Sequence, residues 1–260
     1  MLTQVFYSNP KLGKVILLLQ FIAVLSIAAV MLQQPSLESH YLFLLGFSLA
    51  SVILLSLEKY AFMPFFLMST YCLIAAWRLT ALASLIYLSY FYLLIFILIF
   101  IQFSLCIRNN LKGSVGVYSR FEWQLVFVRL YLGYDLVLHF TEKLFAGALV
   151  RAEDVSYFSS IGLHNPLFFV LLAGLIEFAG SFSLACGFLT RLGSVCLFIY
   201  LIVATFLGGH FHNGFIWANT GGGWEYPLLW SVLILSFAWN GANTFSLDAW
   251  IKEKWGNHLG

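Results

Sequence analysis

The sequence predicts an all-α integral membrane protein with about eight transmembrane helices. Of its 260 residues, 62% are hydrophobic and only 9% are charged, whereas a soluble domain has roughly 45–50% apolar and about 25% charged residues. The mean hydropathy is +0.92, and several apolar runs reach the roughly 20 residues that a helix needs to cross a bilayer. A net charge of +2 with scattered carriers excludes a nucleic-acid partner. The lipid bilayer is the expected surrounding.

Four apolar runs in each half of the chain define the expected spans. Those of the first half cover residues 15–32, 41–57, 61–77 and 79–107. Those of the second half cover residues 123–141, 166–189, 192–208 and 227–241. A polar stretch, 108–122, separates the halves. We therefore expect an N-terminal four-span extension over residues 1–110, a second membrane module over 120–250 and a cytoplasmic tail over 251–260.

The distribution of Lys and Arg predicts the orientation, because these residues are enriched in cytoplasmic loops. With the N-terminus inside, the cytoplasmic cations are Lys11, Lys14, Lys59, Arg108, Lys112, Arg120, Arg191, Lys252 and Lys254. The outer cations are Arg78, Lys143 and Arg151. This imbalance favours a multi-pass protein with both termini in the cytoplasm. Residues 246–255 also suit a short interfacial helix on that side.

Two ionisable residues lie deep within the spans of the second half. Arg129 is roughly 18 Å and Glu177 roughly 16 Å from the outer ends of their spans, at 1.5 Å per residue. Ionisable groups at such depth are costly and need partners or a function. The equal depths predict a buried ion pair between the two helices, and the alternative is a proton-carrying Glu177 held ionised by Arg129.

A second group of polar residues is expected near the outer surface. Asp135, His139 and Glu142 follow an i, i+4, i+7 spacing, which places them on one helical face. His210 and His212 lie where the next-to-last span ends on the same side. Imidazole and carboxylate together suit a transition metal, so His139, His210 and His212 are candidate metal ligands. The alternative is a set of surface histidines, and haem is disfavoured because these histidines lie near the surface.

The outer loop over residues 209–226 combines glycines with aromatic residues. Trp217 and Trp224 offer flat apolar surfaces, and Glu225 lies two residues before the last span. Such a loop suits a lid over a binding pocket, and an interfacial aromatic belt is the alternative.

Several motifs of the second half, in this order, resemble the DoxX family. They are Arg129-Leu-Tyr-Leu-Gly133, Glu142-Lys-Leu-Phe145, Leu175-Ile-Glu-Phe-Ala-Gly180, Gly187-Phe-Leu-Thr-Arg191, His210-Phe-His-Asn-Gly214, Gly223-Trp-Glu-Tyr-Pro227 and Phe245-Ser-Leu-Asp248. The resemblance covers about residues 120–250. It implies a DoxX-like four-helix bundle in a bacterial inner membrane, of the kind found among subunits of thiosulfate:quinone oxidoreductases.

Three functions from different classes are compatible with these observations. The first is a component of a membrane redox system, a quinone-linked oxidoreductase subunit, with an outward-facing quinone or metal pocket and other membrane or periplasmic redox subunits as partners. His139 and Glu177 are then the catalytic candidates, and the binding candidates are Arg129, Asp135, Trp217, Trp224 and Glu225. The second is a non-enzymatic scaffold or assembly subunit. The third is a small metal or proton transporter, although the sequence lacks a pattern of broken helices.

Overall fold

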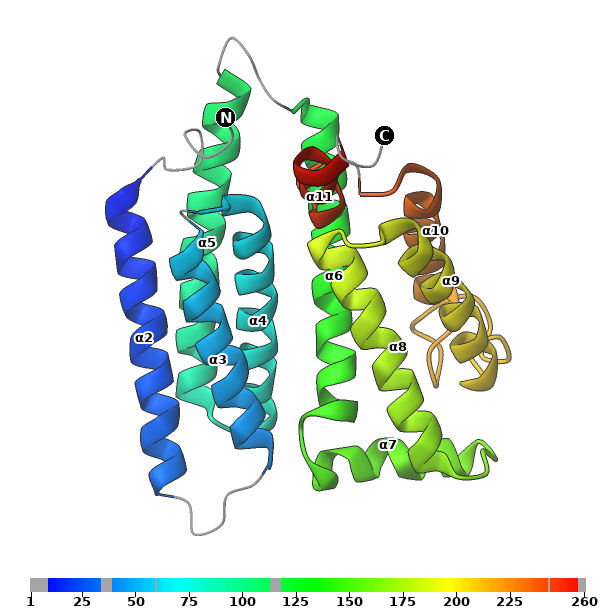
Figure 1. Cartoon of the computed structure of the whole chain (residues 1–260). Helices are drawn as coiled ribbons and strands as arrows, with labels where there is room; N and C mark the ends of the chain where they lie inside the picture. The colour runs from blue at the N-terminus through cyan, green and yellow to red at the C-terminus, as the bar shows by residue number, and fades with distance from the viewer. Residues whose placement is uncertain (1–8, 34–38, 59, 113–117, 243, 257–260) are drawn as a thin grey trace.

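The computed structural model describes residues 9–33, 39–58, 60–112, 118–242 and 244–256, which form helices and turns without a strand (Figure 1). The first half contains α2 (Pro10–Leu32), α3 (Ser39–Leu57), α4 (Phe62–Leu82) and α5 (Ile86–Lys112). The second half contains α6 (Arg120–Leu144), α7 (Ala148–Ser160), α8 (Pro166–Cys186), α9 (Thr190–Leu207), α10 (Glu225–Asn240) and α11 (Leu247–Trp255). The predicted all-α membrane fold is confirmed.

Each of the eight predicted spans coincides with a helix, but six helices in the described ranges are long and apolar enough to cross a membrane. These six are α2, α3, α4, α5, α8 and α9. Helix α6 has 25 residues and carries Arg129 and Asp135 in its middle, and α10 has only 16 residues. The division into two halves stays a prediction, since residues 113–117 of the expected boundary and 257–260 of the expected tail lie outside the described part.

Successive long helices run antiparallel, so that the start of α2 and helix α11 lie at the same end of the bundle (Figure 1). We call this the α11 end. Helix α7 lies across the opposite end, which we call the α7 end. Both ends of the described chain therefore share one side, as an even number of crossings requires.

Helix α7 lies between the predicted spans 123–141 and 166–189, where no helix was predicted. Its 13 residues bury no side chain, and so short an element leaves a weak periodic signal. It follows Gly147, whose φ of +91° turns the chain away from α6. The Arg151 guanidinium donates from Nε to the carbonyl of Lys143 (2.6 Å) and from Nη2 to that of Leu144 (3.0 Å). These bonds satisfy carbonyls that the end of α6 leaves unpaired.

Helices α6 and α8 pack closely because small residues face each other. A Cβ on Gly133 would lie 2.4 Å from the backbone nitrogen of Ala185, so no larger residue fits there. Ser181 Oγ donates to the Gly133 carbonyl at 2.7 Å. This contact sets the relative height of the two helices. Helix α4 packs against α6 and α8 and thereby joins the two halves of the chain.

Glu58, directly after α3, gives the protein an expected pH dependence. The residue is only 9% exposed, and burial raises the pKa of its carboxyl from 4.5 to about 7. Between these two values the folded state binds more protons than the unfolded state, so stability should fall as pH rises and level off above about 7. The loss is at most about 3 kcal/mol. Thermal melts in detergent from pH 5 to 8 should show this slope for the wild type, and Glu58→Gln should reduce it. An equal slope in both proteins would contradict the assignment.

Candidate functional site

Polar side chains from four helices meet near the α7 end and form what we call the ion cluster: Arg78, Glu142, Lys143, Glu177 and Tyr200. Arg78 Nη2 lies 2.9 Å from Glu142 Oε2. Lys143 Nζ lies 3.1 Å from Glu177 Oε2, and the Tyr200 hydroxyl donates to Glu177 Oε1 at 2.6 Å. Lys143 and Glu177 are buried. The cluster ties α4, α6, α8 and α9 together.

The predicted ion pair between Arg129 and Glu177 is wrong. Glu177 instead faces Lys143, while Arg129 lies near the other end of α8, where it contacts Leu184 and Ala185. Equal depths were counted from the predicted span ends. In the structure, Gly174 of α8 packs against Lys143 and Leu144, the last two residues of α6. The part of α8 that precedes Gly174 therefore extends beyond the end of α6. The additional turns of α8 shift Glu177 toward the α7 end.

Arg129 links α6 to the end of α8 and to the segment before α11. Its side chain is fully buried, and Nη1 donates to the carbonyls of Leu184 (2.6 Å) and Ala185 (3.2 Å), while Nη2 donates to that of Phe245 (2.6 Å). The last carbonyls of α8 have no partner within their own helix. Arg129 supplies the donors, so its position indicates a structural function, and the ligand contact expected of it stays a prediction.

Asp248 performs the matching function at the start of α9. Its carboxylate accepts from the backbone nitrogens of Leu189 (2.9 Å) and Thr190 (3.2 Å) and from the Thr190 hydroxyl (3.4 Å). The backbone nitrogen of Asp248 in turn donates to the Gly187 carbonyl at 2.9 Å. A carboxylate at a helix N-terminus satisfies free N–H groups and the helix dipole. Several of the motifs quoted above therefore hold the bundle together.

The three candidate metal ligands do not come together. Within the described part of the chain, no group of three His, Cys, Asp or Glu side chains could hold a metal ion. His139 Nε2 lies 3.8 Å from Asp135 Oδ2, one turn earlier on α6. His210 Nδ1 is 2.9 Å from the Gly222 carbonyl within its own loop. The helix spacing is therefore correct for Asp135 and His139, but His210 and His212 add no ligand to them.

The loop between α9 and α10 folds mostly on itself. Trp217 stacks on His210 with ring centroids 5.7 Å apart, and its backbone nitrogen donates to Glu225 Oε2 at 3.0 Å. Trp224 packs edge-on against Phe215. Trp217, Trp224 and Glu225 thus order the loop, and the lid function expected of them stays a prediction.

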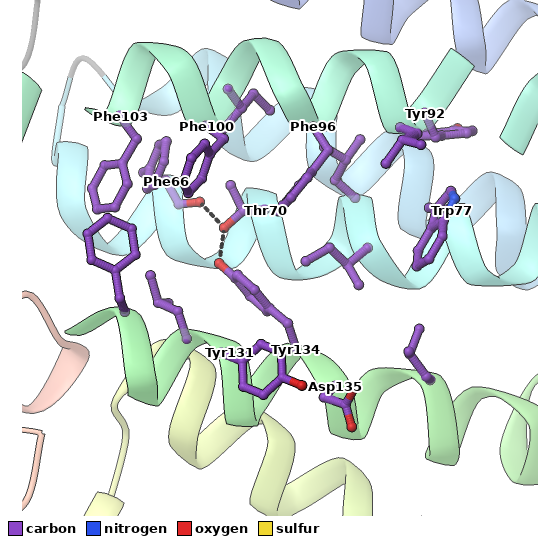
Figure 2. Close-up of a pocket in the computed structure, with 17 residues that line it drawn as sticks. Phe66, Thr70, Trp77, Tyr92, Phe96, Phe100, Phe103, Tyr131, Tyr134 and Asp135 are labelled. Carbon is purple, nitrogen blue, oxygen red and sulfur yellow. Dashed lines mark hydrogen bonds between the residues drawn. The ribbon is translucent and has the colours of Figure 1, made fainter. Parts of the chain in front are cut away.

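A large aromatic cavity lies elsewhere, between α4, α5 and α6, and we call it the lateral cavity (Figure 2). Its volume is about 500 Å³. Most of its lining is apolar, and the full set is Phe66, Thr70, Leu73, Ile74, Trp77, Tyr92, Leu93, Phe96, Ile99, Phe100, Phe103, Phe127, Leu130, Tyr131, Tyr134, Asp135 and Leu138. Among the predicted site residues, only Asp135 lines it.

The polar groups of the lateral cavity are few. Thr70 of α4 and Tyr134 of α6 hydrogen-bond to each other at 2.6 Å and so satisfy one another within the lining (Figure 2). The Asp135 carboxylate lies on the wall formed by α6 and is 25% exposed. Tyr131, one turn away on the same helix, is 62% exposed. An apolar cavity with a small number of polar groups is typical of a site for a lipophilic ligand.

Sequence reasoning missed the residues that α4 and α5 contribute to this cavity. Nothing in the local sequence separates aromatic residues that line a cavity from those that face lipid. Lys143 was likewise treated only as an outer cation, although it is buried and adjoins Glu142. Lys143 lies only two residues after the predicted span 123–141. A lysine so close to the end of an apolar span could have indicated a carboxylate partner within the bundle.

Comparison with known proteins identifies the family that the second half of the chain resembles. Residues 124–210 match the DoxX family model. An uncharacterised protein of Haemophilus influenzae is 30% identical over 124 residues, which are 48% of this chain and 87% of that protein. No solved structure matches the chain. With the helical bundle described above, these matches establish that the chain belongs to the DoxX family of helical membrane proteins.

Proposed function

We propose that this protein is a quinone-binding component of a membrane redox system. The observation that carries the proposal is the lateral cavity, whose aromatic walls suit a quinone ring and whose contact with α6 brings Asp135 to the ligand. Its volume of about 500 Å³ falls in the roughly 300–1,000 Å³ range of small-molecule sites. The site proposed here lies between the two halves of the chain, and the pocket expected near the outer loop stays a prediction.

The pair of Asp135 and His139 supplies a route for protons. Reduction of a quinone to a quinol takes up two electrons and two protons, and each carbonyl oxygen becomes a hydroxyl. Asp135 lines the cavity. His139 Nε2 lies 3.8 Å from Asp135 Oδ2, and 52% of the His139 side chain is exposed. A histidine suits proton exchange near neutral pH. The electrons come from a partner redox subunit. Glu177, the other catalytic candidate, is bound to Lys143 and Tyr200 and has no part in this proton route.

The orientation is part of the same proposal. Both ends of the described chain lie at the α11 end, and we propose that this end faces the cytoplasm of a bacterial inner membrane. Each outer cation then has a partner in the structure, because Arg78 and Lys143 pair with carboxylates and Arg151 binds carbonyls. Periplasmic partners would approach the α7 end.

Filling the lateral cavity tests the proposal. Leu93 lines the cavity and is 40% exposed, so Leu93→Trp should block it. Leu94→Trp is the matched control, because Leu94 is 46% exposed and is not part of the lining. In reconstituted protein, a short-chain ubiquinone should quench tryptophan fluorescence saturably in the wild type and in Leu94→Trp. We expect at least tenfold weaker binding for Leu93→Trp, since the indole occupies the ring position. Equal binding by both variants would refute the site.

The ion cluster favours a second candidate function, a scaffold that holds a membrane complex together. Four helices are joined by it, and its buried charges are paired with one another. For a scaffold, the wild type should fail to bind the ubiquinone probe at all. Asp135→Asn separates the two functions further, because it should retain quinone binding and lose quinone turnover in the assembled complex, whereas a scaffold would be unaffected.

A further inference from the structure

A second cavity lies at the α11 end and shares no lining residue with the lateral cavity. It has a volume of about 420 Å³ and is formed where the start of α9, the end of α10 and α11 meet. Its lining consists of Leu189, Thr190, Arg191, Leu192, Asn240, Gly241, Ala242, Asp248, Ala249 and Lys252. We call it the basal cavity.

The basal cavity contains two basic side chains, Arg191 and Lys252. Neither has an ion-pair partner within the described ranges, in contrast to Arg78 and Lys143 of the ion cluster. The Asp248 carboxylate in the same lining already accepts three hydrogen bonds from the start of α9. The cavity therefore has two free cations and one acid whose charge is largely satisfied.

The backbone positions the two residues that carry these cations. Gly241 ends α10 with a φ of +66°, and a Cβ there would lie 3.4 Å from Arg191 Nε, so the arginine side chain runs over the glycine. Lys252 lies on α11, which Ser246 caps by accepting from the Ala249 nitrogen at 3.1 Å. Through its Asp248, α11 is also bonded to the start of α9.

Apolar residues stand beside the cations. Leu189 and Leu192 belong to the lining and are 55% and 62% exposed. The site thus offers positive charge and exposed aliphatic surface together, which suits an amphiphile better than a free anion. A guanidinium and an ammonium are the usual partners of a phosphate group.

From this arrangement we infer that the basal cavity binds the phosphate of an anionic phospholipid. The phosphate lies between Arg191 and Lys252, and the acyl chains run along Leu189 and Leu192. The inference is independent of the proposed quinone site, because the two cavities share no lining residue.

Lipid binding to the full chain in detergent tests this inference. Phosphatidylglycerol should be retained in native mass spectra and raise the thermal midpoint, whereas phosphatidylcholine and inorganic phosphate should do neither at the same concentration. Each basic residue near an anionic lipid contributes about fivefold in affinity, so R191Q/K252Q should bind phosphatidylglycerol about thirtyfold more weakly. The charge-preserving R191K/K252R should restore most of the binding.

Lys254 provides the matched control on the same helix. It lies 5.5 Å from the centroid of the Trp250 ring and is not part of the lining, so K254Q should bind phosphatidylglycerol like the wild type. Equal losses in K254Q and R191Q/K252Q would show attraction to the basic surface and overturn the site. Equal stabilisation by inorganic phosphate would identify an anion site in place of a lipid site. If R191Q/K252Q fails to fold, R191K/K252R still tests the site. Equal binding of phosphatidylglycerol and phosphatidylcholine by R191K/K252R would count against the proposed lipid site.

Discussion

Replacing Arg129 by methionine is expected to lower the stability of the protein by about 3 kcal/mol or more. The fully buried guanidinium donates to the carbonyls of Leu184, Ala185 and Phe245. Its removal leaves the Leu184 and Ala185 carbonyls at the end of α8 without this donor, and a buried acceptor without a partner costs about 1–3 kcal/mol. The substitution should therefore separate the end of α8 from the segment before α11. Thermal unfolding in detergent measures the effect.

Arg120→Met is the control for this experiment, because Arg120 is an exposed arginine on the same helix. It should leave the melt nearly unchanged, as surface substitutions usually do. Arg129→Lys should lie between the two, since an ammonium cannot donate along both directions of the guanidinium fork. A melt of Arg129→Met that equals that of Arg120→Met would contradict the structural function of Arg129.

The second large effect is expected for Glu177→Gln. This change removes the carboxylate nearest to the buried Lys143 ammonium, at 3.1 Å, and leaves only Glu142, at 4.0 Å, as its ion-pair partner in the described part of the chain. Breaking a buried pair from one side costs about 3–5 kcal/mol. Both side chains are largely shielded from solvent, at 9% and 7% exposure. The hydrogen bond from Tyr200 to an amide oxygen can remain, so the loss reports mainly on the charge pair.

A double-mutant cycle identifies the partner of Glu177. Lys143→Met combined with Glu177→Gln should be less destabilising than the sum of the single changes, because no uncompensated charge remains. Arg129→Met combined with Glu177→Gln should instead be additive, since the two residues have different partners. A coupling of more than about 1 kcal/mol between Arg129 and Glu177 would support the pairing that the sequence predicted and the structure does not contain.

The helices themselves could be predicted from local sequence. An apolar run of spanning length leaves helix as the suitable structure in a bilayer, because every backbone polar group must be satisfied internally. The starts of α8 and α10 agree with the predicted spans to within two residues. Helix α7 could not be found in this way, since it is short and buries none of its side chains.

The partners of charged residues could not be predicted. Depth along a helix follows from the residue count, but the height of one helix against another depends on which small residues allow close packing. Gly133 against Ala185 sets that height for α6 and α8. A shift of a few turns is enough to exchange Arg129 for Lys143 as the neighbour of Glu177.

The sequence by itself determined the membrane class, the approximate helix positions, the family of the second half and the close spacing of Asp135 and His139. These properties depend on composition, hydropathy and the 3.6-residue period, which are local. Only the tertiary structure decided that His210 contacts a carbonyl of its own loop, that Arg129 binds the end of α8, and that Asp135 faces an aromatic cavity. Ion partners and cavity walls come from helices distant in sequence, and their meeting is a property of packing.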